Sequence, residues 1–200
     1  MRIKPYNFLI SFFSLCGCIK PPDIPKIPYI EFKEIYKINT SDSLINKYRI
    51  VFYFRDGDGD IGIRREEQNQ FPFNLGPNGS DTTFNPYHKN LWVTMQLKRN
   101  GNFIDVKFNI PDNKEYNFYG LNQSIIPLNE KALQQKRPIE GVINFDFEVT
   151  IADITFFKPN FLPNRDTVRF KLILVDRAFN KSNEIYTTPI HVVTPRANVF

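Results

Sequence analysis

The stretch Ile143-Asn144-Phe145-Asp146-Phe147-Glu148-Val149-Thr150-Ile151 decides the fold, because apolar and polar side chains alternate along its whole length. Side chains in a β-strand point to opposite faces at successive positions, so this alternation places all the apolar groups on one face. That face is expected to pack into a core while the other meets water. Residues 167–175 repeat the pattern, and the two stretches together predict sheets with one buried face.

Other short runs rich in aromatic and β-branched residues extend this prediction to the whole domain. They lie at residues 29–35, 48–54, 91–98, 103–108 and 184–193. Asn100-Gly101 separates two of them and predicts a tight hairpin, because both residue types tolerate a positive φ. A long polar insert follows the second strand, and residues 128–135 form at most one short helix. We therefore expect an all-β fold, an antiparallel β-sandwich of about seven to nine strands.

The amino terminus has the features of an export signal. Arg2 and Lys4 precede an apolar run over residues 8–15, which is too short to span a bilayer as a mature helix. The run ends in Leu15-Cys16-Gly17-Cys18, which resembles the signal of bacterial lipoproteins. The resemblance implies that residues 1–17 are removed as a signal peptide and that Cys18 carries lipid. The alternative is an ordinary signal peptide with an unmodified cysteine.

Residues 18–28 are expected to form a tether between the lipid and one folded domain over residues 29–200. Four prolines in this segment favour an extended, semi-rigid spacer. The chain has two cysteines, Cys16 and Cys18, and both lie at the predicted leader, so no disulfide is expected in the mature fold. The formal net charge of +5 is spread along the sequence, which argues against a nucleic-acid partner. We expect an outer membrane lipoprotein on the periplasmic or cell-surface face.

The segment Arg55-Asp56-Gly57-Asp58-Gly59-Asp60-Ile61-Gly62 is the candidate metal site. Its three carboxylates disfavour each other's ionised form unless a cation lies between them. Glycines at the intervening positions let the backbone curl, and hard oxygen ligands suit Ca²⁺. The motif resembles the start of the calcium loops in EF-hands and in thrombospondin or dockerin repeats, with Ile61 where the EF-hand has glycine. The alternative is a solvated Asp-Gly turn without an ion.

Two other places can contribute ligands to this site. Glu67, in the same insert, is a candidate outer ligand. Residues 175–183 resemble the Asp-x-Ala-Gly-Asn-x-Ser corner of many bacterial immunoglobulin-like domains, with Phe179 in place of the glycine. That resemblance implies an immunoglobulin-like sandwich, in which the corner and the Asp loop share one end. Asp176 and Asn180 are therefore candidate ligands. The order of elements is also similar to that of immunoglobulin-like lipoproteins of the Bacteroidota, a resemblance that implies no particular activity.

Aromatic side chains in and beside the insert are candidates for a binding surface. These are Phe71, Phe73, Phe84, Tyr87 and Trp92. Aromatic residues on a long loop can bind a partner, and they can equally fasten the loop to the domain. Trp92 can pack against the second sheet or serve as an exposed stacking platform for sugar.

The sequence predicts a protein without catalytic activity. His88 and His191 belong to no recognisable metal or triad pattern. Asp146 and Glu148 can be interpreted as a glycosidase pair, but their alternation also describes the solvated face of a strand. We expect an interaction module for an envelope protein or a glycan, with a structural calcium site. The alternatives are a carbohydrate-binding accessory lipoprotein of a glycan-uptake system and a hydrolase.

Overall fold

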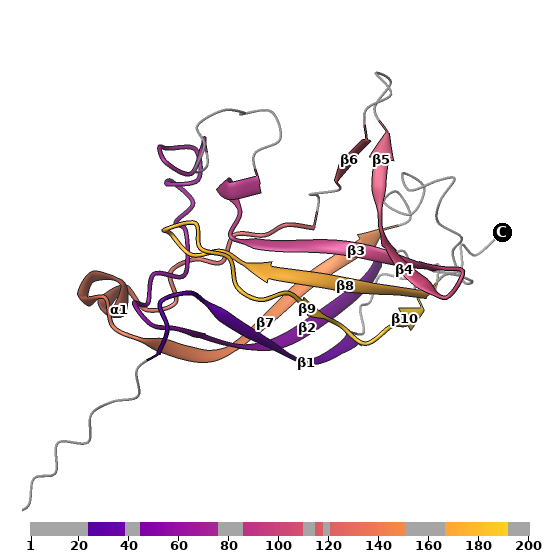
Figure 1. Ribbon diagram of the computed structural model, residues 1–200, viewed down its shortest axis with the longest axis horizontal. Coiled ribbons are helices and arrows are strands. Elements are labelled where there is room, and N and C mark those ends of the chain that lie inside the picture. The colour runs from indigo at the N-terminus through magenta and orange to yellow at the C-terminus, as the bar shows by residue number, and fades with distance from the viewer. Residues whose placement is uncertain are drawn as a thin grey trace, which may run out of the picture.

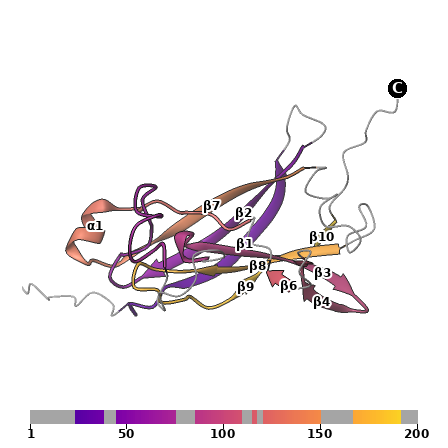
Figure 2. The ribbon, with the colours of Figure 1, turned by 90° about the horizontal axis from the view of Figure 1, so that it is seen from above.

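A computed structural model of the chain describes residues 24–38, 45–75, 86–109, 115–117, 121–150 and 167–191. Two antiparallel sheets pack face to face in this part of the chain, and a short helix lies beyond one end of them (Figure 1). The same layered arrangement is seen from above (Figure 2). The predicted all-β sandwich with one short helix is confirmed.

The first sheet has three strands in the order β1-β2-β7. They are β1 (Tyr29–Ile38), β2 (Ile45–Asp56) and β7 (Ile139–Thr150). β2 is central, as its apolar character on both faces indicates. It pairs along its whole length with β7, where Ile50 lies opposite Phe145 and Asp56 opposite Ile139. This pairing places Asp56 at the end of the sheet where β7 begins.

The second sheet has the order β10-β8-β3-β4, with β9 also paired to β8. Its strands are β3 (Leu91–Arg99), β4 (Asn102–Asp105), β8 (Thr167–Leu174), β9 (Ile185–Tyr186) and β10 (Ile190–His191). Asn100 and Gly101 have φ values of 50° and 85°, as the hairpin prediction requires. A separate ribbon pairs β5 (Lys107–Asn109) with β6 (Glu115–Asn117).

The core lies between the two sheets. On β7, Ile143, Phe145 and Phe147 are buried while Asn144 and Glu148 are exposed, so the predicted alternation is confirmed over this stretch. The ring of Phe147 lies 4.8 Å from that of Phe170 on β8, which joins the layers directly. The sequence pattern of these two strands therefore builds the sandwich, because each contributes its apolar face to the same interior.

Three local predictions need correction. The strand expected over residues 103–108 is interrupted at Val106, whose backbone N–H donates to Met95 O at 2.9 Å, and it divides into β4 and β5. The last expected strand is likewise two short ones, β9 and β10. The insert contains a 3-10 turn, η1 (Pro86–His88). The described residues form ten strands, whereas the sequence predicts about seven to nine.

The predicted helix is α1 (Glu130–Gln135). The side chain of Asn129 caps it by accepting from Ala132 N, and Lys136 ends it in the left-handed conformation. No helix among the described residues is long and apolar enough to cross a membrane.

Candidate metal site

The Asp loop begins where β2 ends. Asp56 is fully buried, and its Oδ2 accepts a hydrogen bond of 2.9 Å from the backbone N–H of Asp60. This contact closes the loop on itself across four residues, so it holds the carboxylates of Asp56 and Asp60 on the same side of the turn. The predicted curling of the Asp-Gly segment is thus seen in the backbone.

Glycines are required in this loop because other backbone segments lie against it. Gly59 has a φ of 67°, and a Cβ there would stand 2.2 Å from Arg137 O. A Cβ on Gly57 would stand 2.1 Å from Ile24 O, and the Gly57 N–H donates to Pro25 O at 3.0 Å. The loop is therefore packed between the residues after α1 and the end of the tether.

The second contribution to the site comes from the corner after β8. Both carboxylate oxygens of Asp176 accept from Asn180, one from its backbone N–H at 2.7 Å and one from its side-chain amide at 2.8 Å. Phe179, which stands where the corner it resembles has glycine, takes the left-handed conformation with a φ of 66°. Its ring packs edge-on against Phe73 and Tyr87, and these contacts offset the backbone strain.

The two segments bring three carboxylates together. One ligand atom from each of Asp56, Asp60 and Asp176 lies within 4.8 Å of the others. Asp58 stands outside this group of three, although its charge acts on all of them. The structure thus places Asp176 at the Asp loop, as the immunoglobulin-like arrangement implied. Asn180 orients Asp176 through its backbone and side-chain N–H groups.

Several carboxylate oxygens at this site have no hydrogen-bond partner. Oδ1 of Asp56, of Asp58 and of Asp60 is buried and accepts no hydrogen bond. A buried carboxylate oxygen without a donor is costly, because it has lost its water without replacement. Three such atoms in one loop, beside the carboxylate of Asp176, form a set of hard oxygen donors of the type that Ca²⁺ binds. The residues therefore fit a divalent cation.

The electrostatics of the site agree with this geometry. Burial is the main cause that raises the pKa of Asp56 to about 7; the carboxylates of Asp58 and Asp176 contribute to the rise, and hydrogen bonds from the backbone of Asp60 and Gly59 oppose it. Burial also raises the pKa of Asp60 to about 7, helped by the three neighbouring acids and opposed by Arg177. The pKa of Asp176 is raised by burial as well. In the metal-free folded protein, burial and the neighbouring carboxylates therefore oppose the ionisation of these three acids.

A pH dependence follows for the metal-free protein. Because the pKa of Asp56 and of Asp60 is higher in the folded than in the unfolded chain, the folded state binds more protons between the two values. Their contribution to stability is complete below pH 3.8 and is lost as the pH rises through about 7. We expect the melting temperature in chelator to fall between about pH 4 and about pH 7.

Circular dichroism melts in chelator measure this fall, and Asp60→Asn is the informative variant because it removes one of the two groups. Its melting temperature should depend less on pH than that of the wild-type chain. A wild-type melting temperature that rises over this range would contradict the expectation.

Glu67 does not lie with these acids as an outer ligand and is instead paired with cations. It accepts two hydrogen bonds from Arg177, at 2.7 and 2.8 Å, and two from Arg64, at 2.8 Å from the backbone N–H and at 3.1 Å from the guanidinium. The Arg177 hydrogen bonds lower the pKa of Glu67 to about 2. Arg177 also donates to Gly62 O at 3.0 Å, so it braces the loop behind the cluster. Sequence reasoning missed this residue, because its partner is 110 positions away and the two share no motif.

Removing the hydrogen bonds of Arg177 to Glu67 and Gly62 should lower the free energy of unfolding. The side chains of Arg177 and Glu67 are 22% and 19% exposed, so Arg177→Gln leaves a largely buried carboxylate without its bidentate partner. We expect a loss of about 1.5–3 kcal/mol in the free energy of unfolding, measured by urea denaturation. Lys33→Gln is the matched control, because its ion pair with Glu31 is about half exposed and should contribute less than about 1 kcal/mol. Equal losses of unfolding free energy in the two variants would contradict a stabilising role of Arg177 in this loop.

The aromatic candidates divide into buried and exposed residues. Phe73 is buried, and Tyr87 lies between Trp92 and Phe179, with ring centroids 5.0 and 5.1 Å away. Cations cover this cluster, with Arg177 over Phe73 and Lys181 over Trp92. These rings fasten the insert to the corner, which is the second of the two predicted roles. Phe71 is 80% exposed, and Phe84 lies outside the described residues, as does Cys18.

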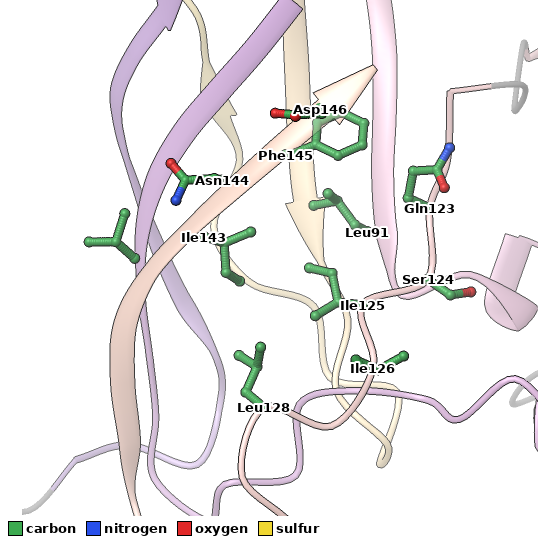
Figure 3. Close-up of a pocket in the computed structure, with 11 residues that line it drawn as sticks. Leu91, Gln123, Ser124, Ile125, Ile126, Leu128, Ile143, Asn144, Phe145 and Asp146 are labelled. Carbon is green, nitrogen blue, oxygen red and sulfur yellow. The ribbon is translucent and has the colours of Figure 1, made fainter. Parts of the chain in front are cut away.

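A pocket of about 460 Å³ opens beside β7 (Figure 3). Its lining is mainly aliphatic, with Leu91, Ile125, Leu128 and Ile143 among the contributors. The carboxylate in the lining is that of Asp146, which receives two hydrogen bonds of 2.6 and 2.8 Å from Arg49. The interpretation of Asp146 as part of the solvated face of β7 therefore describes its surroundings better than a glycosidase pair does.

Comparison with known proteins gives no family. No family model matches the chain, and no curated protein does. A crystal structure of a Northeast Structural Genomics Consortium target is similar over 86% of this chain and 91% of its own, with 11% sequence identity and a TM-score of 0.22. A TM-score at that level carries no argument about fold or function.

Proposed function

We propose that this protein is a non-catalytic interaction module of the bacterial envelope, anchored by lipid on Cys18 and stabilised by calcium at the Asp loop. The anchor rests on the leader, where the apolar run ends in Leu15-Cys16-Gly17-Cys18. One observation carries the calcium site: three buried Oδ1 atoms, on Asp56, Asp58 and Asp60, have no hydrogen-bond donor. A cation bound by Asp56, Asp60 and Asp176 would supply the missing partner of two of these atoms, and of the third when the Asp58 side chain turns toward it.

Calcium suits these residues better than magnesium does. Ca²⁺ accepts six to eight oxygen ligands in flexible geometry, whereas Mg²⁺ demands a near-ideal octahedron and keeps several waters. The site draws its carboxylates from two separate segments of the chain, an arrangement that the flexible coordination of Ca²⁺ accommodates more readily. Its role would be structural, because the cluster joins the loop after β2 to the corner after β8 in a domain without disulfides. Binding would tie these two segments together.

Carbohydrate binding in a glycan-uptake system is the alternative function. It would need aromatic faces along a groove. The described rings of Phe73 and Tyr87 instead pack with Phe179, and that of Trp92 packs with Tyr87. The pocket beside β7 is lined mainly by aliphatic side chains. The interaction module without a sugar groove is therefore the better supported proposal. A hydrolase would need two facing carboxylates in a pocket. The pocket beside β7 is lined by the carboxylate of Asp146, which is paired with Arg49.

Mass spectrometry and calorimetry test the two parts separately. The protein purified from bacterial membranes should begin at Cys18 and carry the mass of acyl chains, and Cys18→Ser should leave the membrane fraction. An exported product with an unmodified Cys18 would refute the anchor. Calorimetric titration of the metal-free chain with CaCl₂ should show one site, which Asp58→Asn weakens. A titration without binding heat or release of protons would refute the calcium site.

A further inference from the structure

The tether is fastened to the folded domain at the Asp loop. Pro25 O accepts a hydrogen bond of 3.0 Å from Gly57, and the backbone of Ile24 and Pro25 fills the space beside Gly57. Ile24 and Pro25 of the predicted tether of residues 18–28 therefore lie against the Asp loop. Ile24 lies six positions after Cys18 in the sequence, and a fully extended chain covers at most about 20 Å over six positions. A lipid on Cys18 must lie within that reach of the Asp loop.

Several segments meet at this end of the sandwich, which we call the loop end. Gly62 packs against Ile126 and Pro127, and Gly59 packs against Arg137, which follows α1. Arg64 forms an ion pair of 2.5 Å with Glu130 on α1. The β3–β4 hairpin lies at the opposite end in both views (Figures 1 and 2). The tether therefore leaves the domain on the side of α1 and the Asp loop.

The loop end exposes apolar and basic side chains. Three large apolar residues of its segments are 43–66% exposed, namely Ile27, Ile126 and Leu128. The exposed basic residues of the same segments are Lys26, Arg65, Lys131, Lys136 and Arg137, and the exposed acids are Glu66 and Glu130. Basic residues near an anionic bilayer contribute about 1 kcal/mol each, and exposed apolar groups enter the headgroup boundary.

We propose that the loop end rests on an anionic phospholipid surface, so that the domain stands with its Asp loop toward the membrane and its β3–β4 hairpin away from it. The inference depends on the proposed lipidation of Cys18. Three observations favour an anionic membrane as the surface that the loop end contacts. They are the place where the tether ends, its short reach, and the excess of exposed basic over acidic side chains. Any partner protein then meets the opposite end of the sandwich.

Site-specific fluorescence in vesicles tests this orientation. The mature lipoprotein has no free thiol once Cys18 is acylated, so one added cysteine can be labelled. Ile126→Cys marks the loop end and Ile104→Cys on β4 is the matched control, since the two isoleucines are 66% and 52% exposed. Each labelled lipoprotein is reconstituted into phosphatidylcholine vesicles with about 30% phosphatidylglycerol and a headgroup spin-label quencher.

We expect several-fold stronger quenching at position 126 than at position 104. Omitting phosphatidylglycerol, or combining Lys131→Glu with Lys136→Glu, should reduce that contrast, while circular dichroism shows the same fold. Equal quenching at both positions, in protein that floats with the vesicles, would overturn the inference and leave the lipid anchor intact. Protein that fails to float would overturn the anchor and the orientation together.

Discussion

We expect calcium to raise the melting temperature of this protein and a chelator to reverse the rise. A ligand that binds only the folded state stabilises it by about 2.7 kcal/mol at one hundred times its dissociation constant. For a domain of this size, that shift corresponds to about 5–10 °C. The effect arises because the cation replaces the missing partners of Asp56, Asp58 and Asp60 and removes their mutual repulsion.

The variant Asp58→Asn separates metal binding from loop structure. Asp58 contributes an unpartnered oxygen, whereas the hydrogen bond that closes the loop belongs to Asp56 and Asp60. We expect the calcium-dependent shift to be smaller in Asp58→Asn than in the wild-type chain, while Glu34→Gln, which changes an exposed acid on β1, retains the full shift. Magnesium should give a smaller shift than calcium. Equal melting temperatures of the wild-type chain in calcium and in chelator would contradict this prediction.

Truncating the ring that joins the two sheets should cause the largest loss of stability. Phe170 is fully buried, and its ring lies 4.8 Å from that of Phe147 on the other sheet. Phe170→Ala removes this contact and leaves a cavity, so we expect a loss of about 3–5 kcal/mol in the free energy of unfolding.

Urea denaturation followed by circular dichroism measures the loss. Ile126→Ala is the control, because Ile126 is 66% exposed and its truncation should change the free energy of unfolding by less than about 0.5 kcal/mol. Similar midpoints for Phe170→Ala and the wild-type chain would show that the sheets do not depend on this layer of the core.

Local sequence patterns predicted the strands and much of the candidate site. The alternation in β7 and β8 identifies their buried faces without knowledge of the partner strand, because the period of two is a property of each strand. Asn100-Gly101 and the Asp loop are likewise local, since positive φ and curled backbone depend on neighbouring residues. The approach of Asp176 required one additional assumption, namely that the two connections share an end of the sandwich.

Contacts between distant residues explain what the sequence did not predict. Glu67 was expected near the metal, but Arg177 binds it across 110 positions. Phe73 is covered by Phe179, the residue that replaces glycine in the corner, so its burial depends on a contact between two loops. The break at Val106 depends on the register of β3 and its neighbours. Such pairings are set by the assembled fold, and no local period encodes them.

A crystal structure grown in calcium chloride tests the central claim most directly. The account predicts anomalous density for one ion, with oxygens of Asp56, Asp60 and Asp176 at about 2.3–2.6 Å and Asp58 turned toward it. Clear density for the four side chains, with their carboxylates splayed apart around water and no ion between them, would contradict it.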